Sequence, residues 1–204
     1  GVSDRDGLTN IANPVVRINL EVKAIDGTAV VEGDKLEIFN MGVSIFDEPI
    51  ILTKEHIKNG YYDYQGFVDN PLEEGKGLLS AKVTDRAGNS SYLSTFAYRI
   101  DTTKLEITSS DEVSIDENIG KSQVVYTTTN DGSDLWKYEL VEGSDRALSI
   151  DANTGKVTLT NSPDFEKQSE YSFTVVATDR AGNTSDPQLV TLTINNLDEI
   201  APTI

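Results

Sequence analysis

The sequence predicts an all-β protein made of two tandem Greek-key β-sandwich domains. Three observations predict this: apolar and polar residues alternate in short segments along the chain, Gly-, Asn- and Asp-rich turns separate these segments, and one turn occurs twice. The turn "TDRAGNS" at 84–90 returns as "TDRAGNT" at 178–184, so that Asp85 and Asp179 stand 94 residues apart. This spacing is close to the length of one small β-sandwich, and it is far too long for a helical or heptad repeat.

The individual elements follow from the alternation. In the first half, the segments expected to be strands are 15–22, 35–39, 77–84 and 94–100. Residues 47–60 are expected to form a strand followed by a loop or a single turn. The second half alternates in the same way over 156–160, 171–178 and 190–194, and Trp136 is expected to lie in the core from a further strand. The side chains expected on buried faces of this half are those of Val157, Leu159, Tyr171, Phe173, Val175, Ala177, Val190, Leu192 and Ile194.

The boundary between the two domains is expected near Thr103, where "RIDTT" ends one strand pattern and "KLEITSS" begins the next. This gives domains over 1–103 and 104–204. In each domain the repeated turn joins the last two strands, so it is expected at the end of the sandwich where the chain enters. Asp85 is therefore expected beside residues 3–10, and Asp179 beside the linker at Asp101.

Composition limits the partners and the compartment. The chain has 17 Lys and Arg residues against 34 Asp and Glu residues, a net charge of −17. This disfavours nucleic acid and anionic membranes, which attract basic surfaces. No apolar run approaches the about 18 residues of a membrane span, so no membrane insertion is expected, and the residues given are not expected to include a signal peptide. Without cysteine, extracellular domains would need staples other than disulfides, and hard cations held by oxygen ligands are the obvious candidate.

Residues 105–202 resemble a cadherin-like repeat. The matching pieces are "DEN" at 116–118 with Gly120, then "LSIDANTGKVTLT", "DFE", "YSFTVVATD" and "INNLDEIAP", in this order. In that family, acidic residues at the C-terminal end of a repeat share calcium with acids of the following linker. The resemblance therefore implies Ca²⁺ bound by Glu117, Asp164, Glu166, Asp198 and Glu199.

The same resemblance implies a second set of calcium ligands at the N-terminal end, formed by Asp131 and Asp179. Three positions depart from the family pattern. Thr129 stands where the family has an aspartate, and Asn196 and Ile200 are weak or lost ligands of the linker. Fewer calcium ions per junction are therefore expected.

Residues 3–103 resemble a bacterial Ig-like repeat of the large secreted biofilm adhesins, through "SDRDGLTN", "VTDRAGNSS" and "IDTT". This resemblance implies Asp6 and Asp85 near one junction and Asp101 at the next. Strand order further suggests that Asp26 and Asp34 join Asp101 at the C-terminal end. The localisation implied is extracellular, on a bacterial cell surface.

Other interpretations of these residues stay open. An aspartate in a turn commonly caps backbone N–H groups and does nothing more. The aromatic residues of "NGYYDYQGF" suggest an alternative function, a glycan- or peptide-binding module using residues 40–76. Alternation places Tyr62 and Tyr64 on one face and Tyr61 on the other, which is equally typical of ordinary sandwich packing.

An enzyme is not expected, because His56 is the only histidine and no nucleophile motif or cysteine accompanies it. The function expected is that of calcium-binding, calcium-rigidified extender modules of a bacterial cell-surface adhesin, which project ligand-binding domains. The partners expected are neighbouring Ig-like and cadherin-like repeats of the same chain, in a monomer.

Overall fold

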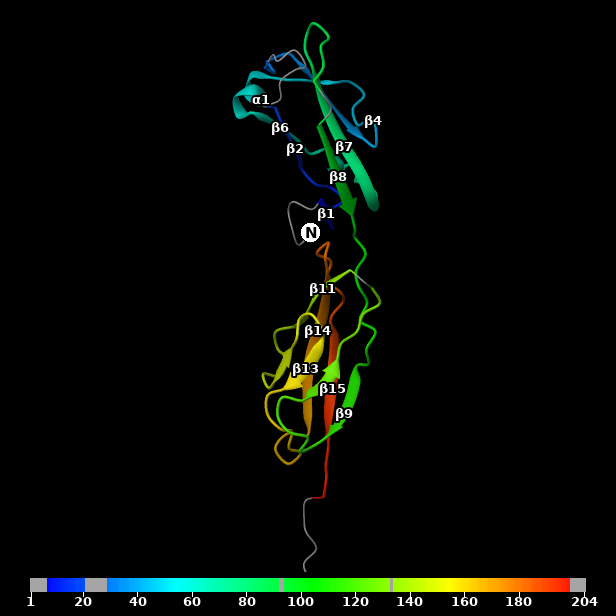
Figure 1. Ribbon diagram of the computed structural model, residues 1–204, viewed down its shortest axis with the longest axis vertical. Helices are drawn as coiled ribbons and strands as arrows, with labels where there is room; N and C mark the ends of the chain where they lie inside the picture. The colour runs from blue at the N-terminus through cyan, green and yellow to red at the C-terminus, as the bar shows by residue number, and fades with distance from the viewer. Residues whose placement is uncertain (1–6, 21–28, 92–93, 133, 199–204) are drawn as a thin grey trace, which may run out of the picture. The chain divides into compact units, whose positions relative to one another are not determined.

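The computed structural model describes residues 7–20, 29–91, 94–132 and 134–198 of the chain. The chain divides into two compact units, Gly1–Thr102 and Thr103–Ile204, and each is described by itself below (Figure 1). The regular structure consists of strands, apart from one short α-helix and one short 3₁₀ helix among the described residues. The predicted all-β fold class is therefore confirmed.

The second unit contains two sheets. The larger has the order β11-β14-β15-β9, formed by Leu135–Leu140, Glu170–Asp179, Gln188–Asn195 and Glu112–Asp116. The smaller has the order β10-β13-β12, formed by Val124–Thr127, Lys156–Leu159 and Leu148–Ile150. β9 runs parallel to β15, whereas the other neighbours are antiparallel.

The core of the second unit lies on the faces that the alternation predicts. Phe173, Val175 and Ala177 of β14 are at most 1% exposed, and they belong to the buried clusters of this unit. The side chains of β13 and β15 expected to point inward are also buried: Val157, Leu159, Val190, Leu192 and Ile194. Tyr171 is half-buried and packs against the same cluster. Burial of each such side chain contributes about 1.5–3 kcal/mol to stability, which explains why the pattern fixes the register.

The prediction for Trp136 is wrong. Its side chain is 45% exposed, although the residue lies in β11 as expected. The cause is an irregularity in the ladder, since Leu135 pairs with Asp179 while Lys137 already pairs with Thr178. A bulge of this kind interrupts the simple alternation of faces. The Lys137 Nζ atom lies 4.7 Å from the centre of the indole ring, so the outward-facing Trp136 forms a cation–π contact.

The first unit has a larger sheet and a two-stranded one. The larger has the order β1-β8-β7-β3-β4, formed by Leu8–Thr9, Ser94–Ile100, Gly75–Thr84, Lys35–Asn40 and Val43–Ser44. β5, Ile50–Ile51, also pairs with β3. The two-stranded sheet joins β2, Val16–Asn19, to β6, Tyr61–Tyr64. The repeated turn joins the last two strands in both units, β7 to β8 and β14 to β15, as predicted.

The segment 47–60 contains the expected short strand, and the structure that follows it is a helix of 6 residues, slightly longer than a single turn. After β5 comes the α-helix α1, Lys54–Asn59, and a 3₁₀ helix over Gly66–Val68 follows β6. Thr53 and His56 cap the start of α1 reciprocally: Thr53 Oγ1 accepts from the His56 N–H, and His56 Nδ1 accepts from the Thr53 N–H. Gly60 ends the helix with φ 76°, a conformation that favours glycine. His56 therefore has a structural role.

The aromatic residues after this helix belong to the core. Tyr62 and Tyr64 pack against the buried clusters, and the rings of Tyr64 and Phe67 meet edge to face at 4.9 Å. Phe67 is only 3% exposed. Tyr61 faces the other way, where the Arg17 guanidinium lies 3.7 Å from its ring centre. The predicted alternation is confirmed, and the described residues form no exposed aromatic platform here.

Two predicted positions in the first unit are wrong. β1 pairs in parallel with Arg99 and Ile100, so the described part of the entry segment lies at the end of β8 away from the turn at Asp85. Asp34 precedes Lys35, which pairs with Thr84, so Asp34 lies at the Asp85 end of the sheet and not with Asp101. The reason is that a short parallel first strand can contact any part of the last one, and strand order does not fix which part. Asp6 and Asp26 lie outside the described residues.

Candidate metal centre

Glu117 is held by the turn that ends β9. Its N–H donates to the Asn195 carbonyl at 3.2 Å, which continues the parallel pairing of β9 with β15. Asn118 then takes a left-handed conformation with φ 63°, which asparagine tolerates better than most residues. The Asn118 N–H donates to the Pro163 carbonyl at 3.0 Å. The "EN" pair therefore joins the end of β9 to the loop that carries Asp164 and Glu166.

The Glu117 carboxylate is almost completely buried, with 2% of the residue exposed. Its Oε2 atom accepts from the Phe165 N–H at 2.9 Å, and its Oε1 atom accepts from the Leu197 N–H at 2.7 Å. A carboxylate offers about four acceptor positions, so two stay available for another donor or a cation. Glu117 thus links the 163–166 loop to the segment that leaves β15.

The loop after β13 presents two further carboxylates. Phe165 packs against the core of the unit, and Asp164 and Glu166 on either side of it remain accessible to solvent. Asp164 Oδ1 accepts from the Lys167 N–H at 3.1 Å, and Asp164 Oδ2 from Lys167 Nζ at 2.5 Å. Glu166 Oε1 accepts from Asn196 Nδ2 at 3.0 Å.

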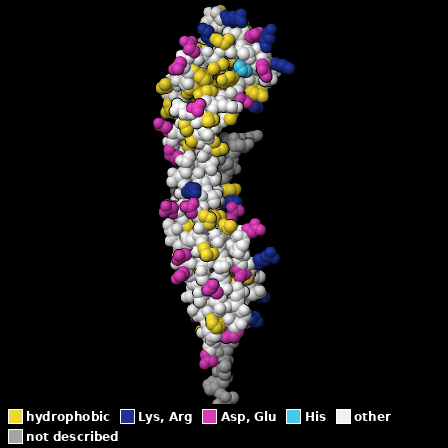
Figure 2. Space-filling view, turned by 180° about the vertical axis from the view of Figure 1, so that it is seen from behind, with side chains coloured by type: hydrophobic (Ala, Val, Ile, Leu, Met, Phe, Trp, Pro, Cys, Tyr) yellow, Lys and Arg dark blue, Asp and Glu magenta, His cyan; other side chains and the backbone are white. Residues whose placement is uncertain are grey.

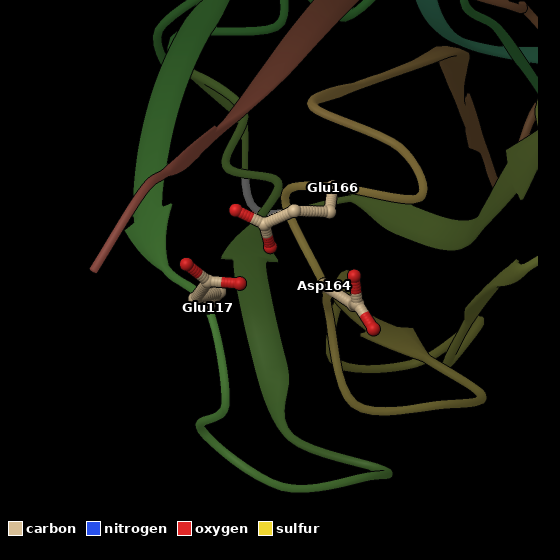
Figure 3. Close-up of side chains that lie close together, drawn as sticks. All are labelled: Glu117, Asp164 and Glu166. Atoms are coloured by element: carbon tan, nitrogen blue, oxygen red, sulfur yellow. The ribbon is translucent and has the colours of Figure 1, made fainter. Parts of the chain in front are cut away.

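These three acids come together. Ligand atoms of Glu117, Asp164 and Glu166 lie within 4.8 Å of one another, and this is the one group of three or more His, Cys, Asp or Glu side chains at such distances in the described part of the chain. Figure 3 shows the carboxylates of Glu117 and Glu166 facing each other, with Asp164 to one side. The donors are all oxygens, and Ca²⁺ is a hard cation that takes about six to eight oxygen ligands. The residues therefore fit calcium better than zinc, which favours nitrogen and sulfur ligands.

Lys167 is the residue at this site that sequence reasoning missed. Its hydrogen bonds, first that of its side chain, hold the pKa of the Asp164 carboxyl below its usual value, against partial desolvation. The signal was a lysine three residues after an aspartate, a pattern too common to be noticed without the structure. Asn196, expected as a weak ligand, contacts the site by donating to Glu166.

The linker acids are only partly described. Asp198 is exposed and follows Leu197, whose N–H binds Glu117, so it lies next to the cluster along the chain. Glu199 and Ile200 lie outside the described residues. Ligation by Asp198 and Glu199 stays a prediction.

The repeated turn has a similar pattern of hydrogen bonds in both units. Asp85 Oδ1 accepts from the N–H groups of Ala87 and Asn89, and Asp179 Oδ1 accepts from those of Gly182 and Asn183. The other carboxylate oxygen accepts from the side-chain amide of Asn89 or Asn183. These bonds, first that of the Asn89 side chain, lower the pKa of Asp85. The geometry gives both aspartates the turn-capping role, and metal ligation by them stays a prediction.

The turn of the second unit lies beside the first residues of that unit. Asn183 Nδ2 donates to the Thr103 carbonyl at 3.2 Å, and Lys104 Nζ donates to Asp186 at 2.9 Å. Asp131 contacts the same N-terminal segment, since its Oδ1 atom accepts from the Glu106 N–H at 2.8 Å. Each bond is internal to the unit, and ligation by Asp131 is likewise untested.

Asp101 and Thr129 have structural partners of their own. Asp101 follows β8, its carboxylate accepts from Arg99 at 3.0 Å, and its N–H donates to the Thr9 carbonyl at 3.0 Å. Thr129 Oγ1 lies 2.9 Å from Thr108 Oγ1, in the place where an aspartate was expected for a ligand. The N-terminal end of the second unit therefore has fewer acids available than its C-terminal end.

The excess of acidic residues is visible on the surface. On the face drawn in Figure 2, Asp and Glu side chains are scattered over both units and do not form one continuous field. Among the described residues, no helix is long and apolar enough to cross a membrane.

The comparisons with known proteins concern mainly the second unit. The family model "Cadherin domain" matches residues 105–195, and no curated protein matches the chain. The third cadherin domain of human protocadherin 7 is 22% identical over 48% of this chain and 92% of that one, with a TM-score of 0.41. The protocadherin GammaB4 extracellular domain is 17% identical over 92% of this chain, with a TM-score of 0.41, and this chain spans 31% of its length. Over residues 105–195 the chain is thus similar to cadherin domains, which are adhesion modules that usually bind calcium.

Proposed function

We propose that the two units are calcium-binding, calcium-rigidified extender modules of a bacterial cell-surface adhesin. In this proposal residues 1–103 are a bacterial Ig-like domain and 104–204 a cadherin-like domain. Their partners are neighbouring repeats of the same chain, and their task is mechanical: they hold a ligand-binding domain away from the cell. In this proposal no residue has a catalytic role.

The observation that supports the proposal best is the cluster of Glu117, Asp164 and Glu166. A carboxylate that is 2% exposed, with two others whose oxygens lie within 4.8 Å, is costly unless a cation compensates the charge. Glu117 also binds the Leu197 N–H, so a cation held there acts directly on the segment that leaves the unit. Calcium at this site would therefore restrict the start of the following linker.

Thermal unfolding with millimolar calcium, with the same concentration of magnesium, and with EDTA tests the proposal. Extracellular modules bind calcium with a Kd of about 10⁻⁴–10⁻³ M. A cation that binds only the folded state stabilises it by RT ln(1 + [L]/Kd), and ~1 kcal/mol shifts the midpoint of a domain of this size by ~4–8 °C. We expect a rise of several degrees with calcium and little with magnesium. Equal midpoints in all three buffers would contradict the proposal.

A further inference from the structure

Lys167 places its ammonium group against Asp164, one of the three acids of the cluster. Both Asp164 oxygens accept from this one residue: Oδ1 from its N–H at 3.1 Å and Oδ2 from its ammonium group at 2.5 Å. The other two acids of the cluster accept from neutral donors. Glu117 is bound by the N–H groups of Phe165 and Leu197, and Glu166 by the amide of Asn196. The positive charge is therefore placed at one specific member of the cluster.

We propose that the Lys167 ammonium group competes with calcium for Asp164 and thereby lowers the calcium affinity of this site. The inference rests on the proposed function and concerns the regulation of the same site. Without calcium, the ammonium group compensates part of the charge of three neighbouring carboxylates. A dication held at Asp164 would repel the ammonium group that lies 2.5 Å from Oδ2, so each cation weakens the binding of the other there.

The geometry allows such an exchange. The Lys167 side chain is 81% exposed, so it can move into solvent without disturbing the packing of the unit. Lysine is a compact charge on a flexible stem, which makes departure easier than for a forked arginine. The Lys167 N–H bond to Oδ1 comes from the backbone and does not depend on the position of the ammonium group. Asp164 can therefore exchange one cation for the other while its loop stays in place.

The size of the effect follows from two terms with the same sign. Binding calcium breaks an exposed ion pair, and the displaced ammonium group still repels the bound dication. Exposed pairs of this kind correspond to about two- to fivefold in an equilibrium constant. Removing the charge of Lys167 should therefore tighten calcium binding by about that factor.

The test is isothermal titration of the whole 204-residue chain with Ca²⁺ at constant ionic strength, comparing wild type with three variants. Lys167→Gln should bind calcium about two- to fivefold more tightly. Lys167→Arg, which keeps the charge, should stay within about twofold of wild type. Lys137→Gln is the matched control, because Lys137 also forms a short ion pair, with Glu139 at 2.6 Å. Lys137 pairs with Thr178, at the end of β14 opposite to Glu170. The calcium affinity of Lys137→Gln should therefore equal that of wild type.

A second measurement follows the ammonium group itself. The ¹⁵N resonance of Lys167 Nζ should shift when calcium is added, while that of Lys137 should not. Equal calcium affinity of wild type and Lys167→Gln would overturn this inference and leave the proposed function intact. If neither protein binds calcium, both fall. Binding by Lys167→Gln alone would support the inference, since the lysine would then block the site.

Discussion

Glu117 combines burial, two main-chain hydrogen bonds and two neighbouring carboxylates. Glu166, in contrast, is exposed and accepts from one side-chain amide. The two residues would share one cation, but they differ in how much of the fold depends on them. Because Glu166 is exposed, its substitution should affect metal binding with little effect on folding, whereas substitution of the buried Glu117 should affect both.

We expect Glu117→Gln to reduce calcium binding and to destabilise the calcium-free protein by about 1–3 kcal/mol, because its new NH₂ group would face a backbone N–H. Glu166→Gln should reduce calcium binding equally, yet change the calcium-free stability by less than about 0.5 kcal/mol. Urea unfolding in EDTA and calcium titration measure the two effects. The assignment of the site is wrong if Glu166→Gln binds calcium as wild type does.

At the scale of elements, the repeated turn is one hydrogen-bonding unit used twice. Beyond the aspartate and asparagine, Ser91 and Ser185 each accept from a main-chain N–H of the preceding strand, that of Val83 or Ala177. The sequence is repeated because the same side chains close the same hairpin in both units. The two copies differ in burial, since Asp179 is 2% exposed and Asp85 is only half-buried.

Asp179→Ala should therefore destabilise the second unit by about 1–3 kcal/mol, since the N–H groups of Gly182 and Asn183 lose their acceptor. Asp85→Ala should destabilise the first unit less, because water can replace the lost carboxylate there. Denaturant unfolding with calcium and with EDTA measures both. If Asp179 acts only in the turn, its loss costs the same in both buffers. A larger loss with calcium would instead identify Asp179 as a ligand.

At the scale of the whole molecule, each unit has its own buried clusters. Those of the first unit include Leu36, Ile38 and Phe67, and those of the second include Val157, Phe173 and Leu192. The cluster of Glu117, Asp164 and Glu166 belongs to the second unit, and in the described part of the first unit no comparable group of acids is found. The units should therefore respond differently to calcium.

Differential scanning calorimetry should resolve two transitions, and calcium should raise the midpoint of the one that belongs to the second unit. The Asp179→Ala and Asp85→Ala variants assign the transitions, because each lowers one of them. We expect the midpoint of the first unit to move by less than about 2 °C. A stabilisation of ~1 kcal/mol would move it by ~4–8 °C. An equal rise of both transitions would contradict the assignment of the main calcium site to the second unit.

The sequence by itself determined the fold class, most of the longer strands and the buried faces of the second unit, because alternation has a period of two and a slip of one residue would expose an entire face. It also indicated Glu117, Asp164 and Glu166 through the resemblance to a cadherin-like repeat. It was wrong for Trp136, where a bulge shifts the faces of β11. A bulge depends on how two strands align, which a local pattern does not contain.

Only the tertiary structure decided which charges meet. It placed Lys167 on Asp164, Glu117 against the N–H groups of Phe165 and Leu197, and β1 beside the far end of β8. It also showed that both carboxylate oxygens of Asp85 and Asp179 are used within their own turns. The physical reason is that hydrogen bonds and ion pairs act over a few ångströms between residues far apart in the chain. The distances that decide between a turn cap and a metal ligand exist only after folding.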